Sequence, residues 1–91
     1  MKRIYVVGTA DTKGPELQYV KSLIEGAGAP AILVNVGTKT PQVAVDVAAA
    51  DVAVCHPRGA HFVLGGDDRG MAVEAMAEAF AQYISRRDDI A

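Results

Sequence analysis

Two apolar runs in the first half of the chain predict buried β-strands. The first covers residues 4–7 and ends at Gly8, and the second covers residues 31–36 and ends at Gly37. Both runs are rich in β-branched residues and are continuously apolar, which is typical of parallel strands covered on both faces. The residues between the runs leave room for a helical crossover, so we expect a parallel pair of neighbouring strands.

The segment between these strands predicts a loop followed by a helix. Residues 9–14 are polar and rich in turn formers, and Pro15 suits the first helical position because its missing N–H would have no partner there. Apolar residues then recur at steps of three and four until glycines interrupt the pattern. We therefore expect a helix over residues 15–26. Its apolar stripe is expected at Leu17, Val20, Ile24 and Ala27.

The middle of the chain gives weaker signals. Residues 43–47 alternate between apolar and polar as a short edge strand does, and residues 48–54 predict about two helical turns. Residues 55–66 contain Pro57 and three glycines, which predict a loop. Within that loop, the apolar residues 62–64 are expected to dock onto the core.

The clearest helical pattern lies near the C-terminus. Asp67 or Asp68 can cap its N-terminal end, while Arg86 and Arg87 suit the negative C-terminal end of the helix dipole. Between these ends the apolar residues follow helical spacing, so we expect a single face of this helix to enter the core. That face consists of Val73, Met76, Ala77, Phe80 and Ile84.

The order of these elements predicts an α/β protein with a Rossmann-like, three-layer parallel sheet, of which this chain is an incomplete N-terminal half. The alternation of strand and helix stops where an α/β chain normally returns to another strand. A short parallel sheet then keeps an open edge, and open edges recruit other chains. We expect residues 1–91 to form a single domain that is the N-terminal half of a larger nucleotide-binding domain, completed by the remainder of a longer chain or by homo-oligomer formation.

Composition and charge exclude several classes of partner. The 91 residues include nine Lys and Arg against eleven Asp and Glu, so the formal net charge of -2 argues against nucleic acid as a partner. The apolar runs are shorter than the roughly 20 residues of a membrane span, and the N-terminal run is too short for a signal peptide. A single cysteine fits a reducing compartment. We expect no membrane partner and a cytoplasmic location.

The loop at residues 8–14 is the best candidate site, because ligands of open α/β sheets bind at the carboxyl ends of the strands. A phosphate there would meet helix N–H groups and the Lys13 ammonium, and Thr9 or Thr12 would donate a hydroxyl or touch a metal ion. Asp11 would meet a ribose or a hydrated Mg²⁺. The loop matches neither G-x-G-x-x-G nor G-x-x-x-x-G-K-[ST], so an ordinary connection between strand and helix is the alternative.

Two further polar clusters have a structural explanation as well as a functional one. Residues 67–70 can line the same edge, with Arg69 donating to a phosphate, or they can form a helix cap with one solvated arginine. Cys55, His56 and His61 are zinc-ligand types, but their spacing matches no structural zinc pattern, so we expect a half-buried cysteine and surface histidines without a metal. No catalytic constellation is apparent, and enzymatic activity of these residues alone is not expected.

Two strings in the sequence resemble the ATP-binding domain of the tobamovirus-resistance protein family. The first is Tyr5–Lys13 followed by Glu16–Leu17, and the second is Asp67–Val73 with Met76–Ala77. The resemblance implies a Rossmann-like nucleotide-binding domain made of two α/β halves, with ATP as the ligand, with or without Mg²⁺. The glycine-rich segment of that family would come after residue 91. The cofactor-binding residues that it implies are Thr9, Asp11, Thr12, Lys13, Arg69 and Gly70.

The expected function is therefore a part of an ATP-binding domain, with the phosphates near the loop after the first strand. The alternative is a protein–protein interaction or oligomerisation module without nucleotide turnover. The aromatic content of 5% and the absence of tryptophan argue mildly against a large interface built on aromatic anchors.

Overall fold

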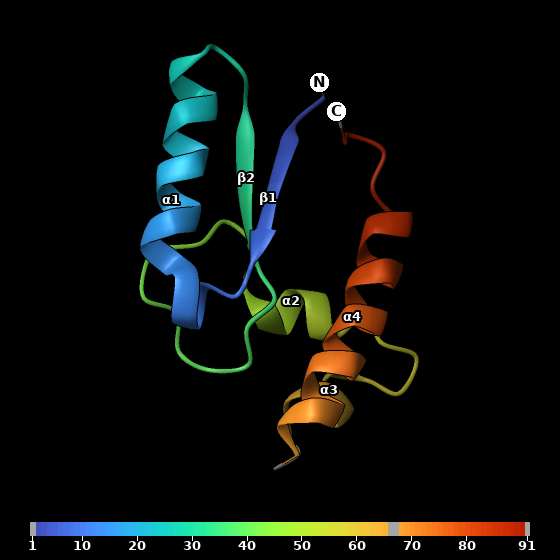
Figure 1. Cartoon of the computed structure of the whole chain (residues 1–91). Helices are drawn as coiled ribbons and strands as arrows, with labels where there is room; N and C mark the ends of the chain where they lie inside the picture. The colour runs from blue at the N-terminus through green and yellow to red at the C-terminus, as the bar shows by residue number, and fades with distance from the viewer. Residues whose placement is uncertain (1, 66–67, 91) are drawn as a thin grey trace.

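Strands and helices alternate through the first part of the chain, and three helices follow (Figure 1). The computed structural model describes residues 2–65 and 68–90, and for Arg69 it describes the backbone alone. The elements are β1 (Ile4–Gly8), α1 (Ala10–Gly26), β2 (Ala31–Asn35), α2 (Ala49–Ala53), α3 (Ala60–Leu64) and α4 (Arg69–Ser85).

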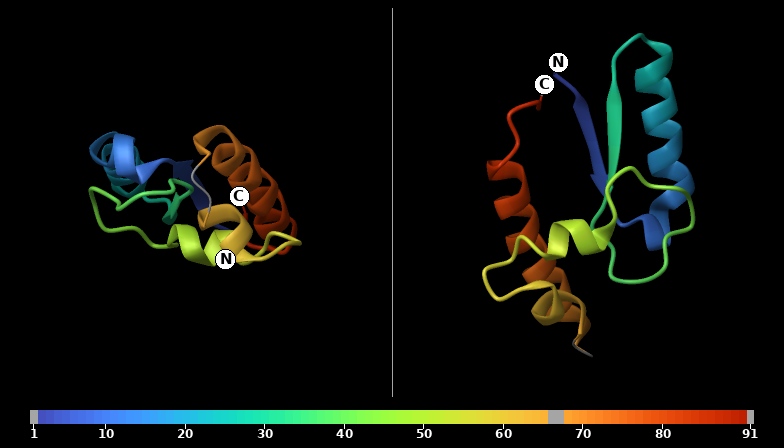
Figure 2. Two further views of the ribbon diagram at one scale, coloured as in Figure 1. Left: turned by 90° about the horizontal axis from the view of Figure 1, so that it is seen from below. Right: turned by 180° about the vertical axis from the view of Figure 1, so that it is seen from behind.

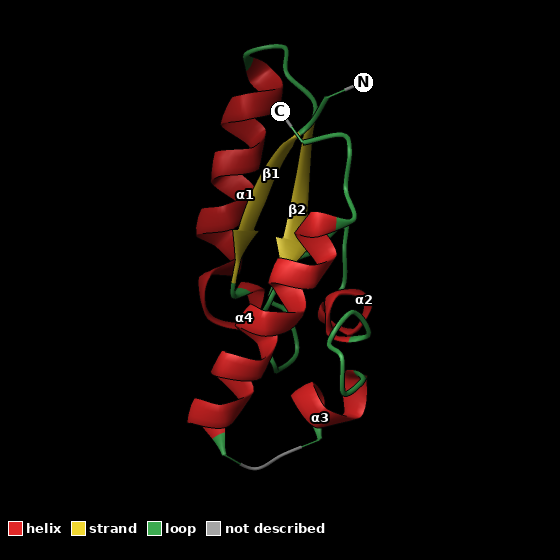
Figure 3. Ribbon diagram, turned by 90° about the vertical axis from the view of Figure 1, so that its right-hand side faces the viewer, coloured by secondary structure: helices red, strands yellow, loops and turns green. Residues whose placement is uncertain are grey.

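The two strands are parallel neighbours, as predicted. Their register runs from the pair Ile4–Ala31 to the pair Gly8–Asn35, so both strands end at the same edge. The sheet lies between α1 on one face and α4 with the short helices on the other (Figures 1 and 3). This arrangement confirms the α/β class and is that of an incomplete Rossmann-like N-terminal half.

Each face of the sheet has its own apolar contacts, because side chains alternate along a strand. Val6 and Leu33 form a register pair on the side of α1, and both are buried. Gly8 lies so close to α1 that a Cβ there would come within 2.7 Å of the Leu17 side chain. The opposite face carries the main core, which joins β2 to the other helices. Its buried members are Ile32, Val34, Val52, Ala53, Cys55, Val63, Ala75, Met76, Ala79 and Tyr83.

The helix predicted to begin at Pro15 begins earlier, at Ala10, and is interrupted by a kink. Lys13 has non-helical dihedral angles (φ −123°, ψ 25°), so a first turn is joined to the main helix that contains Pro15. The carbonyl of Thr9 accepts hydrogen bonds from the N–H groups of Thr12 and Lys13, which stabilises that first turn. The sequence did not predict this turn, because its residues are polar and rich in turn formers.

Two other local predictions are wrong. Residues 43–47 do not form a strand in the described structure; only Val47 pairs, as an isolated parallel bridge to Val34. Residues 60–64 form the helix α3 instead of a loop, and its Val63 is 1% exposed. The predicted turns near residues 48–54 are present as α2. In each case the tertiary contacts with the core override weak local preferences.

Lys21 and Asp46 fasten α1 to the loop that follows β2. The Lys21 ammonium lies 2.7 Å from the Asp46 carboxylate, which also accepts the Leu33 N–H at 2.8 Å. Burial by itself raises the pKa of Asp46, but the bonds from Lys21 and Leu33 outweigh it and lower that pKa. The hydrogen bond that Lys21 donates to Asp46 raises the pKa of Lys21. The pair therefore fixes the position of α1 against this loop.

Helix α4 buries a different stripe from the predicted one. Ala75, Ala79 and Tyr83 are buried together with Met76, whereas Val73 is 59% exposed and Ala77 is also exposed. The reason is that α4 packs on α2 and α3 and stands away from β1, as the view from below also shows (Figure 2). On α1, the predicted stripe is likewise only half-buried at Leu17 and Ile24, and Val20 and Ala27 are exposed.

The end of the chain returns to the beginning of β1. Arg3 and Ile90 form an isolated parallel bridge, and the Arg3 N–H donates to the Asp89 carbonyl at 2.6 Å. The Tyr5 hydroxyl donates to the Asp89 carboxylate at 2.5 Å, and the Arg3 guanidinium lies 3.7 Å from the same group. Residues 88–90 are thus held against the edge of β1 opposite β2. In the described parts of the chain, none of the helices has the length and apolar character that a bilayer crossing requires.

The Tyr5–Asp89 contact predicts a late tyrosine titration. Burial, together with the hydrogen bond to Asp89, raises the pKa of Tyr5 to about 12. Because the pKa of Tyr5 is raised in the folded state, the Tyr5–Asp89 contact contributes fully to stability when the pH is below 10.0, the ordinary pKa of tyrosine. This contribution is lost as the pH rises towards 12. We expect Asp89→Ala to lower this pKa, measured by tyrosinate absorbance. Asp88→Ala is the control, because only the backbone carbonyl of Asp88 is engaged, by Lys2; an equal shift in both variants would contradict the assignment.

Candidate functional site

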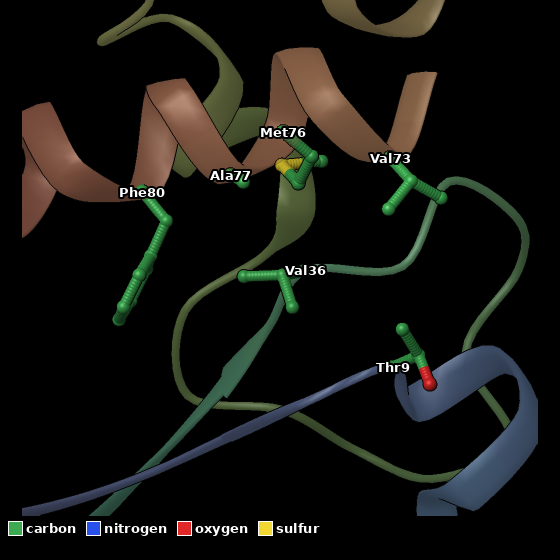
Figure 4. A pocket seen from close by; sticks show the side chains of 6 residues that line it. All are labelled: Thr9, Val36, Val73, Met76, Ala77 and Phe80. Atoms are coloured by element: carbon green, nitrogen blue, oxygen red, sulfur yellow. The ribbon is translucent and has the colours of Figure 1, made fainter. Parts of the chain in front are cut away.

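The candidate site lies at the edge where both parallel strands end. β1 continues through Thr9 into α1, and β2 continues through Val36 into a loop. Figure 4 shows Thr9 and Val36 on the sheet side of this edge, with α4 above them. This is the edge at which the sequence places the loop of residues 8–14, and it is the usual ligand edge of an open α/β sheet.

Asn35 organises this edge from the last position of β2. Its side chain is 2% exposed, and its Oδ1 accepts the N–H of Ala10 at 3.0 Å and the N–H of Gly37 at 2.8 Å. One buried amide therefore holds both the first residue of α1 and the turn after β2. A polar residue at the end of an otherwise apolar run is the signal in the sequence that points to this role.

Asp11 faces the same turn. Its Oδ2 accepts the N–H of Lys39 at 3.2 Å, while its buried Oδ1 has no hydrogen-bond partner among the described residues. A Cβ at Gly37 would lie 2.5 Å from that Oδ1 and 3.0 Å from the Oδ1 of Asn35, so only glycine fits beneath these side chains. Asp11 thus joins α1 to the turn after β2.

The other three predicted residues of the loop are exposed. Thr9 and Thr12 place their hydroxyl oxygens 2.8 Å apart, and Lys13 holds its ammonium 3.8 Å from the Glu16 carboxylate. An ion pair this exposed contributes little free energy and is easily exchanged for another anion. The two hydroxyls are hydrogen-bonded to each other, so a ligand at the surface of this edge would exchange that bond for its own contacts with them and with the Lys13 ammonium.

The N–H groups at the start of α1 are largely engaged by the protein itself. Asn35 takes the N–H of Ala10, the Thr9 carbonyl takes those of Thr12 and Lys13, and the Gln42 Oε1 takes that of Gly14 at 3.0 Å. From the sequence we expected these donors to meet a phosphate. The structure instead leaves side-chain groups as the main polar contacts that this turn offers to a ligand.

An apolar groove of ≈ 260 Å³ lies beside these residues, between α4 and the end of the sheet (Figure 4). Thr9 supplies its polar side chain, and Val36 forms part of its floor. The other lining residues come from α4, and their side chains point towards the sheet: Val73, Met76, Ala77 and Phe80.

The start of α4 carries the remaining predicted residues. Asp68 caps the helix, since its Oδ1 accepts the N–H of Met71 at 3.1 Å; Asp67 lies outside the described residues. Arg69 and Gly70 form the first turn, one turn before Val73 in the groove. The backbone of α4 therefore begins on the same side as the candidate edge, and the predicted role of Arg69 and Gly70 is not tested by this geometry.

Cys55, His56 and His61 have different surroundings in the structure. Cys55 is buried, with its thiol 3.8 Å from the Asp51 carbonyl, and His61 is exposed. His56 was expected at the surface but is buried: its Nδ1 accepts the Arg58 N–H at 3.0 Å. The packing of α2 and α3 around the turn between them explains this burial. Within residues 2–65 and 68–90, no three His, Cys, Asp or Glu side chains gather as metal ligands would.

Comparisons with known proteins place the chain in a family. The model of the uncharacterised protein family UPF0261, N-terminal domain, matches residues 2–91. A UPF0261 protein of Rhizobium meliloti is 59% identical over the whole chain, and one of Mesorhizobium japonicum is 54% identical. A third, from Clostridium tetani, is 30% identical over 93% of the chain. No solved structure matches the chain.

These matches correct the family expected from the sequence. Membership in the tobamovirus-resistance ATP-binding family is wrong, because the model that matches and the relatives at high identity are all UPF0261. The chain spans 23% of the length of its Rhizobium and Mesorhizobium relatives, so it corresponds to one part of those proteins. The chain belongs to the UPF0261 family and corresponds to its N-terminal domain.

Proposed function

We propose that this chain contributes part of an ATP-binding domain, with the phosphates bound at the carboxyl edge of the sheet. The observation that carries the proposal is the surface cluster of Thr9, Thr12 and Lys13 in the first turn of α1, directly after β1. An ammonium and two hydroxyls at the ligand edge of a parallel sheet suit a phosphate group.

Each residue has a distinct part in this proposal. Lys13 exchanges its contact with Glu16 for a phosphate oxygen, which costs little because the existing pair is exposed. Thr9 and Thr12 donate hydroxyl hydrogen bonds. Asp11 acts by positioning, since it binds the Lys39 N–H and its second oxygen is buried at Gly37. Arg69 and Gly70 are proposed to complete the phosphate contacts from the start of α4, and Mg²⁺ would accompany the nucleotide.

Replacement of Lys13 tests the proposal. We expect Lys13→Ala to weaken the binding of ATP with Mg²⁺ about ten- to a hundredfold, because a charge-assisted hydrogen bond contributes about 1.5–3 kcal/mol. Calorimetric titration measures the affinity, for the 91-residue chain and for a fusion in which this chain replaces the matching part of the longer Rhizobium meliloti relative. We expect the shorter form to bind more weakly, since it carries only part of the phosphate contacts.

Arg86→Ala is the matched control for this titration. It also removes one positive charge from an exposed position, but at the opposite end of α4. Its affinity for ATP should equal that of the unaltered chain. Equal affinities for Lys13→Ala and Arg86→Ala would remove the assigned role of Lys13, and submicromolar binding by the 91-residue form would contradict the proposed division of contacts.

One observation favours the alternative function of an interaction module. The stripe of Val73, Ala77 and Phe80 on α4 lines an apolar groove that the described part of the chain does not fill. An exposed apolar surface of this kind is typical of a contact with another polypeptide. The two functions are compatible, because a polypeptide in the groove would contact Thr9 but leave Thr12 and Lys13 at the surface of the edge.

A further inference from the structure

Another cavity lies at the other end of the sheet, where both strands begin. Its volume is ≈ 300 Å³, and it is bounded by the first residues of the strands, the loop after β2 and the end of α4, which lies near this end of β1 (Figure 1). Arg3 and Tyr5 line it together, because alternate residues of a strand share a face. Tyr83 and Arg87 line it from the end of α4. The cavity is therefore separate from the candidate edge, which lies at the opposite end of β1.

Tyr83 is the residue that points to a ligand in this cavity. It is 4% exposed, yet its hydroxyl has no hydrogen-bond partner among the described residues. The hydroxyl is not enclosed by protein atoms, so it opens onto the cavity. Burial and Asp89 are the main causes of the raised pKa of Tyr5, and Tyr83 adds to them, which places the two phenol groups near each other. Because a buried tyrosine hydroxyl usually has a partner, an atom within the cavity is expected to supply one.

Arg87 adds a cation with free donors beside this hydroxyl. Its guanidinium lies over the Tyr83 ring, 4.4 Å from the centroid, and it forms no ion pair within residues 2–65 and 68–90. Stacking engages the face of a guanidinium and leaves its N–H groups free in the plane. Two such N–H groups match the two oxygens of a carboxylate. Arg87 and Tyr83 together therefore offer N–H and O–H donors to one carboxylate.

The two carboxylates that line the cavity are already engaged. Asp46 pairs with the Lys21 ammonium at 2.7 Å. Asp89 accepts the Tyr5 hydroxyl and lies 3.7 Å from the Arg3 guanidinium. Lys21 and the two arginines of the cavity thus face two carboxylates, which leaves one positive charge unbalanced. A single negative charge restores the balance, whereas a dianion would be repelled by the same two carboxylates.

We propose that this cavity binds a small organic acid with a single carboxylate. The carboxylate accepts hydrogen bonds from the Arg87 guanidinium and the Tyr83 hydroxyl. The apolar body of the acid packs on Ile32 and Val47, which also line the cavity. A volume of ≈ 300 Å³ has room for about ten non-hydrogen atoms, since one water molecule takes about 30 Å³ of the liquid. This site shares none of its residues with the proposed ATP site, so it stands or falls without any measurement of nucleotide binding.

Calorimetric titration with benzoate tests the proposal. Benzoate has one carboxylate and an apolar body of suitable size, and the protein is the fusion in which this chain replaces the matching part of the Rhizobium meliloti relative. We expect saturable binding of benzoate. Benzamide, which lacks the charge, and inorganic phosphate, which is largely a dianion at neutral pH, should each bind at least about tenfold more weakly. Equal affinities for the three ligands, or no binding of benzoate, would overturn the proposal.

The 91-residue form separates two sources of the carboxylate. An Asp or Glu side chain from the rest of the longer protein can reach the cavity instead of a free acid. In that case benzoate would bind to the 91-residue form and not to the fusion, and the proposal of a free ligand would be wrong. A free acid is expected to bind to the fusion.

Two substitutions in the fusion assign the binding to this cavity. Tyr83→Phe removes the hydroxyl and keeps the ring beneath Arg87, so the affinity for benzoate should fall about tenfold. Arg87→Ala should lower it about ten- to a hundredfold. The matched controls are Tyr19→Phe and Arg86→Ala, because both residues are exposed and neither lines the cavity. Affinities that change no more in Tyr83→Phe and Arg87→Ala than in these controls would contradict the proposal.

Discussion

Replacing Leu33 with alanine is expected to lower the free energy of unfolding by about 2–5 kcal/mol. Leu33 is 1% exposed and lies in β2, on the face that α1 covers. The loss in stability has two parts: the transfer free energy of the groups that are no longer buried, and the free-energy cost of the cavity that remains. The cavity remains because α1 cannot move onto the two short strands without losing its contacts at Gly8. A domain of this size is stable by only about 5–15 kcal/mol, so the effect is large.

Chemical denaturation monitored by circular dichroism measures this change, and Leu23→Ala is the matched control. Leu23 lies on α1 and is 56% exposed, so the same substitution there should change the stability by about 0.5 kcal/mol or less. If the two variants lose equal stability, Leu33 is not packed as the structure has it, and the assignment of a separate apolar contact between α1 and the sheet is wrong.

The second large effect is expected at Asn35. Asn35→Ala should destabilise the fold by about 2–4 kcal/mol, because the N–H groups of Ala10 and Gly37 both lose their acceptor in a buried environment. The loss would also release the turn after β2 from the start of α1. A faster amide exchange at Ala10 and Gly37 should therefore accompany the lower midpoint of unfolding.

Gln42→Ala provides the comparison for this prediction. Gln42 likewise accepts one N–H at the start of α1, that of Gly14, but its side chain is exposed and water can replace it. We expect this variant to cost about 1 kcal/mol or less. Should Asn35→Ala cost no more than Gln42→Ala, then the buried amide does not organise the edge, and the site has another source of rigidity.

The candidate edge therefore has an inner and an outer set of residues. Asn35 and Asp11 are engaged with the backbone and determine where the loop lies, while Thr9, Thr12 and Lys13 present their polar atoms to the surface. A nucleotide would meet only the outer set. Substitutions of the inner residues should therefore change stability first, whereas Lys13→Ala should change affinity without changing the unfolding midpoint.

The C-terminal segment shows what local patterns cannot convey. Asp89 and Ile90 have no secondary-structure signal of their own, yet they pair with Arg3 at the opposite end of the chain. Likewise, the apolar residues of α4 show helical spacing in the sequence, but two overlapping stripes of residues fit that spacing. Which stripe is buried depends on where α2 and α3 lie, and that position is a property of the assembled core.

The amino-acid sequence by itself determined the class of the fold and the principal elements. Two continuous apolar runs rich in β-branched residues favour covered strands, and the glycines and the Asp67–Asp68 pair mark helix ends through local backbone chemistry. The sequence also placed Thr9, Thr12 and Lys13 after the first strand. Only the tertiary structure decided the role of Asn35, the burial of His56 and the open stripe on α4. Each of these features depends on contacts between residues far apart in the chain, and such contacts produce no periodic pattern in a single sequence.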